Sequence, residues 1–337
     1  MTRRLGVVMV GLGPGSQPHL HSLADLRDIA ELRWAVCREP DTASLGPLAG
    51  TVKPTSNLAA ALADPAVNVA IVATPASTHY EVARQCLDAG KHTLVEKPLE
   101  ISLQRAEQLV KYAEQSIPRF GVVLQHRFRP GSIKLRALLA EGRLGEIQNA
   151  SVKVPWWRPQ SYYDEPGRGT IQRDGGGVLL TQAIHAIDLF RSLVGVKSVE
   201  AAQVTTTAIH KMETEDYVNA LLTLGNGAPG FLTATTTMYP GQAESIDVVG
   251  TKATATLCGG ELNVFFHDGE TITIESDGRS GGGASIMDFS HEPHCSLISD
   301  FLDSVSNGRS PIVTGSEALE THRLIDTILQ RGEKTST

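Results

Sequence analysis

The fold is decided by residues 5–16, which read LGVVMVGLGPGS. The run Leu5–Val10 is continuously apolar, which is typical of a strand buried on both faces of a parallel sheet. Glycines follow at once, and a helical pattern then continues to about Ala30. Strand, glycine turn and helix in this order form the context that a dinucleotide-binding fingerprint requires. A glycine-rich turn that binds no ligand is the alternative interpretation.

The glycine turn suits the pyrophosphate of a dinucleotide. Gly11 permits a tight turn, and Gly13 lets the backbone approach the phosphates. The helix that follows offers free N–H groups and a partial positive charge at its N-terminus. The third fingerprint position holds Ser16, a mild change because serine is small and a good N-cap. The expected cofactor contacts from this turn are Gly11, Leu12, Gly13, Pro14 and Gly15.

The end of the second predicted strand, Leu32–Cys37, indicates which cofactor is preferred. In enzymes that use NAD, an acidic residue near this point bonds the ribose 2′-hydroxyl. Here Arg38 takes that place, and a guanidinium group matches a 2′-phosphate. Glu39 follows directly, so NAD stays open as a second cofactor. We therefore predict NADP as the preferred cofactor.

Apolar strands alternate with helical patterns through the first third of the chain. This alternation predicts an α/β fold with a doubly wound parallel sheet, the Rossmann arrangement, over residues 1–124. The remaining residues, 125–337, would form a second domain. The predicted strands are Val69–Ala73, His92–Val95 and Phe120–Leu124, and the predicted helices are Ser77–Ala89 and Ser102–Gln115.

The sequence VEKPL, residues 95–99, places a lysine at the carboxyl end of a short apolar strand. Lysine is rarely buried unless it is paired, and Pro98 restricts Lys97 to extended backbone angles. The proline also makes a cis peptide accessible. Ligands of open α/β sheets bind beyond these strand ends. Lys97 is thus a candidate site residue, with a surface lysine in a strand–helix turn as the alternative.

Composition argues against several classes of protein. The 337 residues carry a formal net charge of −7 without a basic block, which argues against nucleic acid and anionic membrane surfaces as partners. No apolar run approaches the roughly 20 residues that span a bilayer. Four widely spaced cysteines suit a reducing, cytoplasmic location and predict no structural metal site. The run His291–Cys295 has metal-ligand residue types, but we expect it to cap the helix that follows.

The second domain opens with a helical pattern at Pro130–Glu141 and a strand at Glu146–Val154. From Val199 to about Ile274 the pattern has period two and short turns, which predicts mainly antiparallel strands. The glycine-rich stretch Gly278–Ala284 predicts a mobile loop. The predicted strands are Ala202–Ile209, Tyr217–Leu224, Phe231–Met238, Ser245–Val249, Ala253–Leu257 and Leu262–Phe266, followed by helices at Ser296–Ser306 and Ser316–Gln330.

A loop rich in aromatic residues and arginines follows the first strand of this domain. Trp157 and Tyr163 carry large rings with polar tips, which suit a sugar or another ring-bearing substrate. Arg158 and Arg168 could bind a carboxylate bidentately. A loop between domains whose aromatic side chains only pack is the alternative.

The next segment, residues 177–193, has the period of a single helix. His185 and Asp188 are three residues apart and would share a helix face, on which Thr181 lies one turn earlier. Gln182 lies three residues before His185. The His–Asp pair could be a fragment of a metal site, or a structural histidine satisfied by its neighbour.

Four stretches, in order along the chain, resemble the glucose–fructose oxidoreductase, inositol dehydrogenase and rhizopine-catabolism (Gfo/Idh/MocA) family of nicotinamide enzymes. The motif E-K-P combined with a downstream G-G-G…H-x-x-D is specific for this family, whereas neither motif by itself is specific. The resemblance implies an N-terminal Rossmann domain and a C-terminal α+β domain with a large, mostly antiparallel open sheet. One face of that sheet often builds a dimer or tetramer in the family. The stretches are GLGPGSQPH (11–19), ATPASTHYEVARQCLDAGKHTLVEKPL (73–99), GGGVLLTQAIHAIDL (175–189) and GRSPIVTGSEAL (308–319).

The resemblance also implies roles for single residues. Lys97 matches a lysine that reaches the nicotinamide ribose and the reacting oxygen, and His185 matches the acid–base histidine. Many members have an aspartate four residues before that histidine, where this chain has Thr181. The implied catalytic residues are Lys97 and His185. Thr74, Pro75, His79, Glu96 and Lys97 match residues around the cofactor, and Trp157, Arg158, Tyr163, Arg168, Thr181 and Gln182 are the expected substrate contacts.

Together these residues predict reversible hydride transfer between a nicotinamide cofactor and the secondary alcohol or ketone of a sugar, sugar acid or cyclic polyol or diol. His185 would take the hydroxyl proton, and Lys97 would stabilise the alkoxide charge. A redox-assisted, NAD-dependent glycosidase and a non-catalytic cofactor-binding sugar sensor are the alternatives. The expected partners are a carbohydrate or polyol and further copies of the chain, in a homodimer or homotetramer.

Overall fold

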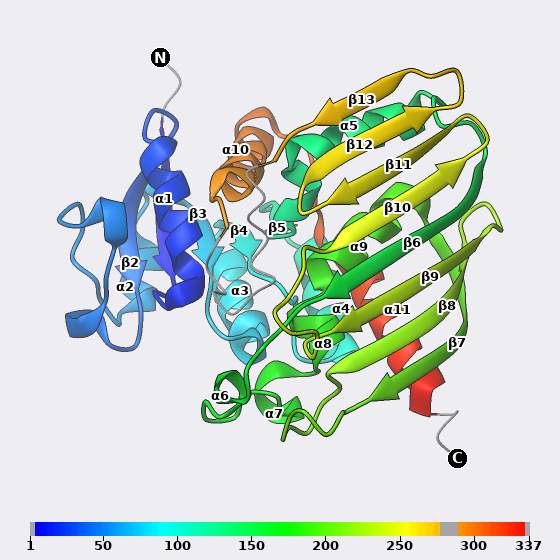
Figure 1. Cartoon of the computed structure of the whole chain (residues 1–337). Coiled ribbons are helices and arrows are strands. Elements are labelled where there is room, and N and C mark those ends of the chain that lie inside the picture. Colours follow the sequence, from blue (N-terminus) through cyan, green and yellow to red (C-terminus); the bar gives the residue numbers. More distant parts are fainter. Residues whose placement is uncertain (1–3, 277–288, 334–337) are drawn as a thin grey trace. The chain divides into compact units, whose positions relative to one another are not determined.

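The computed structural model describes residues 4–276 and 289–333, which form two compact units (Figure 1). Met1–Gln125 and His291–Glu320 form the Rossmann unit, and His126–Ser290 and Thr321–Thr337 form the sheet unit. We predicted one boundary, after residue 124, and therefore placed residues 291–320 in the second domain. In the structure, that segment belongs to the first unit. The predicted loop at Gly278–Ala284 lies outside the described residues.

The Rossmann unit contains a five-stranded sheet in the order β2-β1-β3-β4-β5, and every pair is parallel. The strand order reverses between β1 and its neighbours β2 and β3, so ligands are expected beyond the carboxyl ends of β1 and β3. The predicted parallel sheet is confirmed. Its strands are β1 (Leu5–Val10), β2 (Ala30–Val36), β3 (Val67–Val72), β4 (His92–Val95) and β5 (Phe120–Val122).

Helices surround this sheet, and one of them comes from the far end of the chain. Helix α10 packs along α1 in the Rossmann unit, where the Ser22 hydroxyl lies 3.5 Å from the His291 carbonyl oxygen. Phe301 of α10 lies against Gly121 of β5, where an added Cβ would come within 2.9 Å of its ring. The helices are α1 (Gln17–Asp25), α2 (Leu58–Ala63), α3 (His79–Asp88), α4 (Leu103–Glu114) and α10 (Glu292–Asn307).

Two of the predicted elements in this unit differ from the structure. The first helix ends at Asp25 rather than near Ala30, because Ala30 already pairs with Leu5 in the sheet. The run His291–Cys295 was expected to cap a helix, but α10 starts at Glu292 and His291 makes no side-chain cap bond. His294 therefore lies inside the helix and is buried.

The sheet unit contains eight strands in the order β13-β12-β11-β10-β6-β9-β8-β7. All neighbours are antiparallel except β6 and β9, which run parallel. The predicted large, mostly antiparallel open sheet is confirmed. Its strands are β6 (Ile147–Pro155), β7 (Val196–Thr205), β8 (Tyr217–Leu224), β9 (Pro229–Thr235), β10 (Ser245–Gly250), β11 (Ala253–Cys258), β12 (Glu261–Phe266) and β13 (Thr271–Ile274).

One face of this sheet is covered by helices, and the other is exposed. Helices α5 (Pro130–Ala140), α9 (Ile184–Val194) and the later part of α11 (Gly315–Glu333) lie behind the strands (Figure 1). The strands alternate buried and exposed residues, as expected when one face packs on a core. Three large apolar side chains remain on the exposed positions, namely Leu221, Phe231 and Phe265.

The predicted single helix over residues 177–193 is wrong. The structure has a short helix α8 (Val178–Thr181), a break, and then α9. The Thr181 hydroxyl donates to the Gly177 carbonyl at 2.6 Å, and such local bonds compete with a continuing helix. Thr181 and Gln182 therefore do not share one helix face with His185. Two further short helices, α6 (Gln160–Tyr163) and α7 (Ile171–Asp174), lie in the preceding loop.

The strand predicted at Ala202–Ile209 is shifted, because β7 ends at Thr205. The Asp216 carboxylate accepts the backbone N–H and the hydroxyl of Thr207, at 2.8 Å each, and so draws this segment away from the ladder.

Within the described residues, no single helix is long and apolar enough to span a membrane. Only the bent pair of Ile171–Thr181 and Ile184–Val194, taken together, has that length and apolarity.

Candidate active site

The glycine turn after β1 forms an open cradle. Gly11 has φ +97°, and a Cβ there would lie 2.5 Å from the Ala73 carbonyl oxygen, so only glycine fits. A Cβ added at Gly13 would meet nothing within 4 Å, which leaves the backbone open to a ligand. The buried Ser16 hydroxyl donates to the Gly13 carbonyl at 2.7 Å and fixes the turn. The turn therefore fits the pyrophosphate of a nicotinamide dinucleotide at the start of α1.

The residues after β2 are exposed at the same edge of the sheet. Cys37 is half-buried, and Arg38 and Glu39 are exposed. The Cys37 N–H donates to the Thr55 carbonyl at 2.9 Å, which holds the chain at this point. Arg38 can thus present a cation, and Glu39 a carboxylate, to the ribose of a bound dinucleotide.

Lys97 lies in a turn that Glu96 organises. The peptide bond between Lys97 and Pro98 is cis. The Glu96 carboxylate accepts the Lys97 backbone N–H at 3.0 Å and contacts His19 Nε2 of α1 at 2.7 Å. Burial alone would raise the pKa of Glu96, but the His19 hydrogen bond and nearby Lys97 hold it below its usual range. Glu96 is therefore a carboxylate that ties the lysine turn to the cofactor helix.

His79 joins the same turn to the end of β3. Its ring is 1% exposed, with Nδ1 2.9 Å from the Pro98 carbonyl oxygen and Nε2 2.9 Å from the Thr74 carbonyl oxygen. Burial lowers its pKa, although both carbonyls work in the opposite direction. A neutral imidazole has only one N–H, so it donates to one of these carbonyls at a time. We predicted that His79 contacts the cofactor; the structure buries its ring between the Thr74 and Pro98 carbonyls, and the cofactor contact stays a prediction.

His19, Glu96 and His294 form a cluster with metal-ligand residue types. One ligand atom from each lies within 4.8 Å of the others, and the two imidazoles meet edge to face at 5.4 Å. Two ligands of one tetrahedral zinc would be about 3.3 Å apart, given metal–nitrogen distances near 2 Å. The 2.7 Å contact between His19 and Glu96 is shorter and is a hydrogen bond. We therefore interpret the cluster as hydrogen-bonded, and no metal is assigned to it.

In the sheet unit, the predicted acid–base residue His185 lies near the start of α9. Its side chain is 7% exposed. The ring of His126, from the segment Gln125–Phe128, stacks on it with centroids 4.9 Å apart and planes 29° apart. The sequence prediction did not single out His126. The only signal for it is that histidine and arginine follow the last strand of the first domain directly, in the sequence QHRF.

Asp188 binds an arginine within the sheet unit. Arg127 donates from Nε and Nη2 to the two carboxylate oxygens at 2.7 Å each, and Thr321 donates its hydroxyl at 2.8 Å. Asp188 is fully buried and Arg127 nearly so. These bonds engage both carboxylate oxygens, so Asp188 anchors Arg127 rather than serving as a metal ligand beside His185.

The aromatic loop contains a cluster centred on Tyr162. The Arg168 guanidinium lies 4.2 Å from the Tyr162 ring centroid and donates to its hydroxyl at 2.7 Å. Gln182 donates to the same hydroxyl at 3.4 Å, and the Arg158 guanidinium lies 5.8 Å from the centroid of the same ring. Three predicted substrate contacts, Arg158, Arg168 and Gln182, thus lie around Tyr162. We did not predict Tyr162 as a site residue, although the doublet Tyr162-Tyr163 in the sequence pointed to it.

The other aromatic residues of this loop serve packing. The buried Tyr163 hydroxyl is 2.8 Å from the Thr236 hydroxyl, and burial raises its pKa. Trp157 is half-buried and meets Tyr239 edge to face at 5.5 Å. Arg158 is 2% exposed and donates to the Trp157 carbonyl at 2.7 Å. The packing interpretation therefore fits Tyr163, Trp157 and part of Arg158.

The Gly-Gly-Gly stretch positions Thr181 through a buried acid. A Cβ on Gly177 would lie 1.9 Å from the Glu215 carbonyl oxygen. The Glu215 carboxylate accepts the N–H groups of Gly177 at 2.9 Å and Leu179 at 3.2 Å. Burial raises its pKa, while these N–H groups and the Glu215 backbone lower it in part. The glycine thus allows the close approach that lets Glu215 hold the start of α8.

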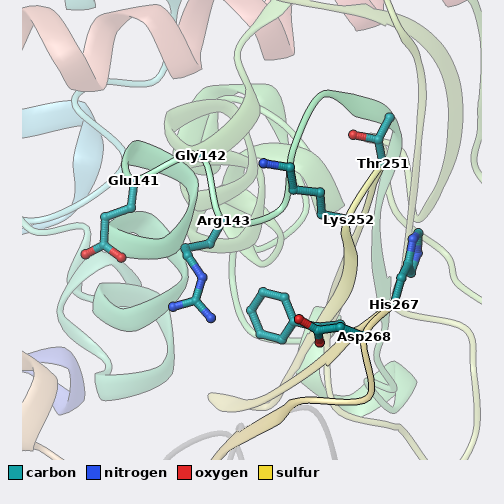
Figure 2. A pocket seen from close by; sticks show the side chains of 8 residues that line it. Glu141, Gly142, Arg143, Thr251, Lys252, His267 and Asp268 are labelled. Atoms are coloured by element: carbon teal, nitrogen blue, oxygen red, sulfur yellow. The ribbon is translucent and has the colours of Figure 1, made fainter.

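A separate pocket of about 380 Å³ lies in the sheet unit, between the end of α5 and the turns near Thr251 and Asp268 (Figure 2). Arg143, one of its lining residues, donates to Glu270 at 2.7 Å and covers the Phe266 ring at 4.7 Å. None of the predicted site residues lines this pocket. We therefore do not assign it to the reaction.

A parallel sheet with this glycine cradle is the architecture of a dinucleotide-binding domain. The model described as "Oxidoreductase family, NAD-binding Rossmann fold" matches residues 5–123, and the model described as "GFO/IDH/MocA C-terminal domain" matches residues 132–256. The two matches together span most of the chain. The protein belongs to the GFO/IDH/MocA family, as its motifs predicted.

Characterised relatives are dehydrogenases. The chain is 26% identical over 274 residues to the NAD-dependent scyllo-inositol 2-dehydrogenase of Bacillus subtilis, covering 76% of this chain and 73% of that protein. It is 29% identical over 165 residues to an NADP-dependent scyllo-inositol 2-dehydrogenase of the same species, covering 48% and 44%.

A solved structure is similar over nearly the whole chain. The WlbA dehydrogenase of Bordetella pertussis, in complex with NADH and UDP-GlcNAcA, has a TM-score of 0.83 and 28% identity, covering 99% of this chain and 98% of that one. These relatives give no support to the glycosidase or the sensor as alternatives.

Proposed function

We propose that the protein transfers a hydride between NADP and the secondary alcohol or ketone of a sugar, sugar acid or cyclic polyol. The observation that carries the proposal is the way Lys97 is held. Its turn is fixed by Glu96 and His79, and Glu96 in turn binds the helix that follows the open glycine cradle. These bonds fix the backbone of the lysine turn beside the dinucleotide cradle before the substrate arrives, and preorganisation of this kind favours catalysis.

The chain's own residues then have distinct roles. When bound, the nicotinamide supplies the hydride acceptor or donor. His185 takes the hydroxyl proton during oxidation and returns it during reduction. The Lys97 ammonium stabilises negative charge on the substrate oxygen. Glu96 keeps the Lys97 backbone in place, and Thr181 contributes through the shape of α8, because its hydroxyl bonds the Gly177 carbonyl.

A carboxylated sugar is the substrate class that the Tyr162 cluster favours. Arg168 presents a guanidinium over an aromatic ring, with Glu165 as an exposed carboxylate partner at 2.5 Å. A substrate carboxylate could replace that exposed partner at little cost, because exposed ion pairs are weak. The relative from Bordetella pertussis was solved with UDP-GlcNAcA, which agrees with an acidic sugar.

The preference for NADP depends on Arg38. This residue is exposed two positions after β2, where a 2′-phosphate would lie, and Glu39 is its neighbour. Relatives use either cofactor, since one scyllo-inositol dehydrogenase takes NAD and another takes NADP. A higher kcat/KM with NAD than with NADP would contradict the preference.

We also propose that the protein is a cytoplasmic homodimer or homotetramer. The apolar side chains Leu221, Phe231 and Phe265 on the open face of the sheet support self-association. In the described part of the chain all four cysteines are free, which suits a reducing compartment. Light scattering coupled to size exclusion tests the assembly, and a monomer at micromolar concentration would contradict it.

The proposed activity is tested by a substrate screen. Sugars, sugar acids, inositols and cyclic diols are offered with each cofactor, and the absorbance of the reduced nicotinamide is followed. We expect turnover with at least one class, and the fastest turnover with a carboxylated sugar and NADP. No cofactor reduction or oxidation across the panel, while the cofactor still binds, would contradict the proposal.

A further inference from the structure

A second buried imidazole lies against the proposed acid–base residue. The His126 ring stacks on the His185 ring with centroids 4.9 Å apart and planes 29° apart. The two residues are 5% and 7% exposed, so water screens them poorly. Both belong to the sheet unit. Two imidazoles at this distance cannot take up protons independently.

The stack is held by the residue next to His126. Arg127 binds Asp188 through two bonds of 2.7 Å, and Asp188 lies three residues after His185 on α9. Thr321 of α11 completes the anchor with a hydroxyl bond of 2.8 Å. The backbone that carries His126 is therefore fixed to the helix that carries His185.

Charged groups around the stack favour a proton on His126 over one on His185. Glu244, just before β10, places a carboxylate oxygen 3.9 Å from His126 Nδ1. Arg129, at the start of α5, donates to the same oxygen at 2.6 Å, so the carboxylate is shared. On α9, Asp188 is neutralised by Arg127, and Arg191 lies 4.0 Å from it.

We propose that His126 is a positioning residue for His185, which holds the plane of its ring and keeps it neutral when pH falls. This inference depends on the proposed function only for its effect on turnover. A positive charge on either ring disfavours a proton on the other. With Glu244 beside His126, the first proton goes to His126 and His185 remains a base.

The test replaces the second titrating ring with one that still stacks. In His126→Phe, the pH at which His185 takes up its proton should rise by about one pH unit, because no cationic ring opposes it. NMR of histidine-labelled full-length protein measures this midpoint, with the His185 signal assigned by its loss in His185→Gln. The acid limb of the kcat profile should move in the same direction.

A second variant and a matched control complete the test. Glu244→Gln removes the carboxylate beside His126 and leaves the Arg129 cation, so it should lower the pH at which His126 takes up its proton. His267→Phe makes the same substitution at an exposed histidine of the sheet unit and should leave the midpoint unchanged.

The outcomes separate this inference from the proposed function. An unchanged or lowered His185 midpoint in His126→Phe would overturn the role of His126, even if turnover fell. A raised midpoint without movement of the kcat profile would support the coupled pair while contradicting His185 as the base. If His126→Phe does not fold, Glu244→Gln gives the decisive result, since an unchanged His126 midpoint would overturn the inference.

Discussion

The lysine turn of the Rossmann unit and the histidine helix of the sheet unit are built in different ways. The Lys97 backbone is held by residues of the single stretch 73–99: Glu96 accepts its N–H, and His79 Nδ1 lies 2.9 Å from the Pro98 carbonyl oxygen. His185 is positioned by residues from distant parts of the chain, namely His126, through stacking, and the Arg127–Asp188 pair. Contacts within one short stretch can be predicted from its motif, whereas contacts between side chains far apart along the chain cannot.

The buried ion pair behind His185 should give the largest effect on stability. Arg127→Leu leaves the Asp188 carboxylate buried without its bidentate partner, which should lower the free energy of unfolding by about 3–5 kcal/mol. Arg143→Leu is the matched control, because its pair with Glu270 is half-exposed and such pairs contribute about 0–1 kcal/mol. Urea unfolding measures both. Equal losses of unfolding free energy in the two variants would show that the buried Arg127–Asp188 pair stabilises the protein no more than the half-exposed Arg143–Glu270 pair does.

The lysine turn should respond in activity more than in stability. Glu96→Ala removes the acceptor for the Lys97 N–H and the link to His19, which should lower kcat by about 100-fold, because small displacements of a catalytic group are costly. Cofactor affinity, measured by fluorescence, should change little. Glu114→Ala, at the exposed end of α4, is the control. A normal kcat in Glu96→Ala would mean that Lys97 is held by other contacts.

The histidine cluster beneath the lysine turn should make the Rossmann unit sensitive to acid. Burial, with the nearby His19, lowers the pKa of His294 to about 3. Between that value and the ordinary 6.5, the unfolded chain binds a proton that the folded chain does not, so stability falls as pH falls. Wild type should therefore lose about 1–2 kcal/mol more than His294→Gln between neutral pH and about pH 5. Urea unfolding at both pH values measures these losses. An equal loss of unfolding free energy in wild type and His294→Gln would contradict the lowered pKa of His294.

The Tyr162 cluster should give the smallest effect. Arg168→Gln removes the cation over the ring and should raise KM for a carboxylated sugar about tenfold, while KM for a neutral polyol stays unchanged. Arg173→Gln, a half-buried arginine of the same loop, is the control. An equal change of KM for both substrates would show that Arg168 supports the loop rather than the substrate.

The sequence predicted the parts of the molecule that depend on neighbouring residues. The glycine turn, the parallel sheet, the large antiparallel sheet and the family follow from local patterns and were confirmed. The single helix at 177–193 was wrong because Thr181 bonds the Gly177 carbonyl, which periodicity does not report. His126 and Glu215 were missed because their partners lie about 40 to 60 residues away along the chain. Tyr162 was missed although Arg168 is six residues away, because the doublet Tyr162-Tyr163 does not indicate which ring the arginine covers. No local sequence pattern indicated that α10, near the end of the chain, belongs to the first unit.

The most direct measurement is a single-turnover experiment with Lys97→Met, in which enzyme loaded with cofactor is mixed with a substrate found in the screen. The account predicts that cofactor still binds while the rate of hydride transfer falls by about 1,000-fold or more, and that Lys111→Met, at an exposed position of α4, has no effect. Hydride transfer at the wild-type rate in Lys97→Met would contradict the account.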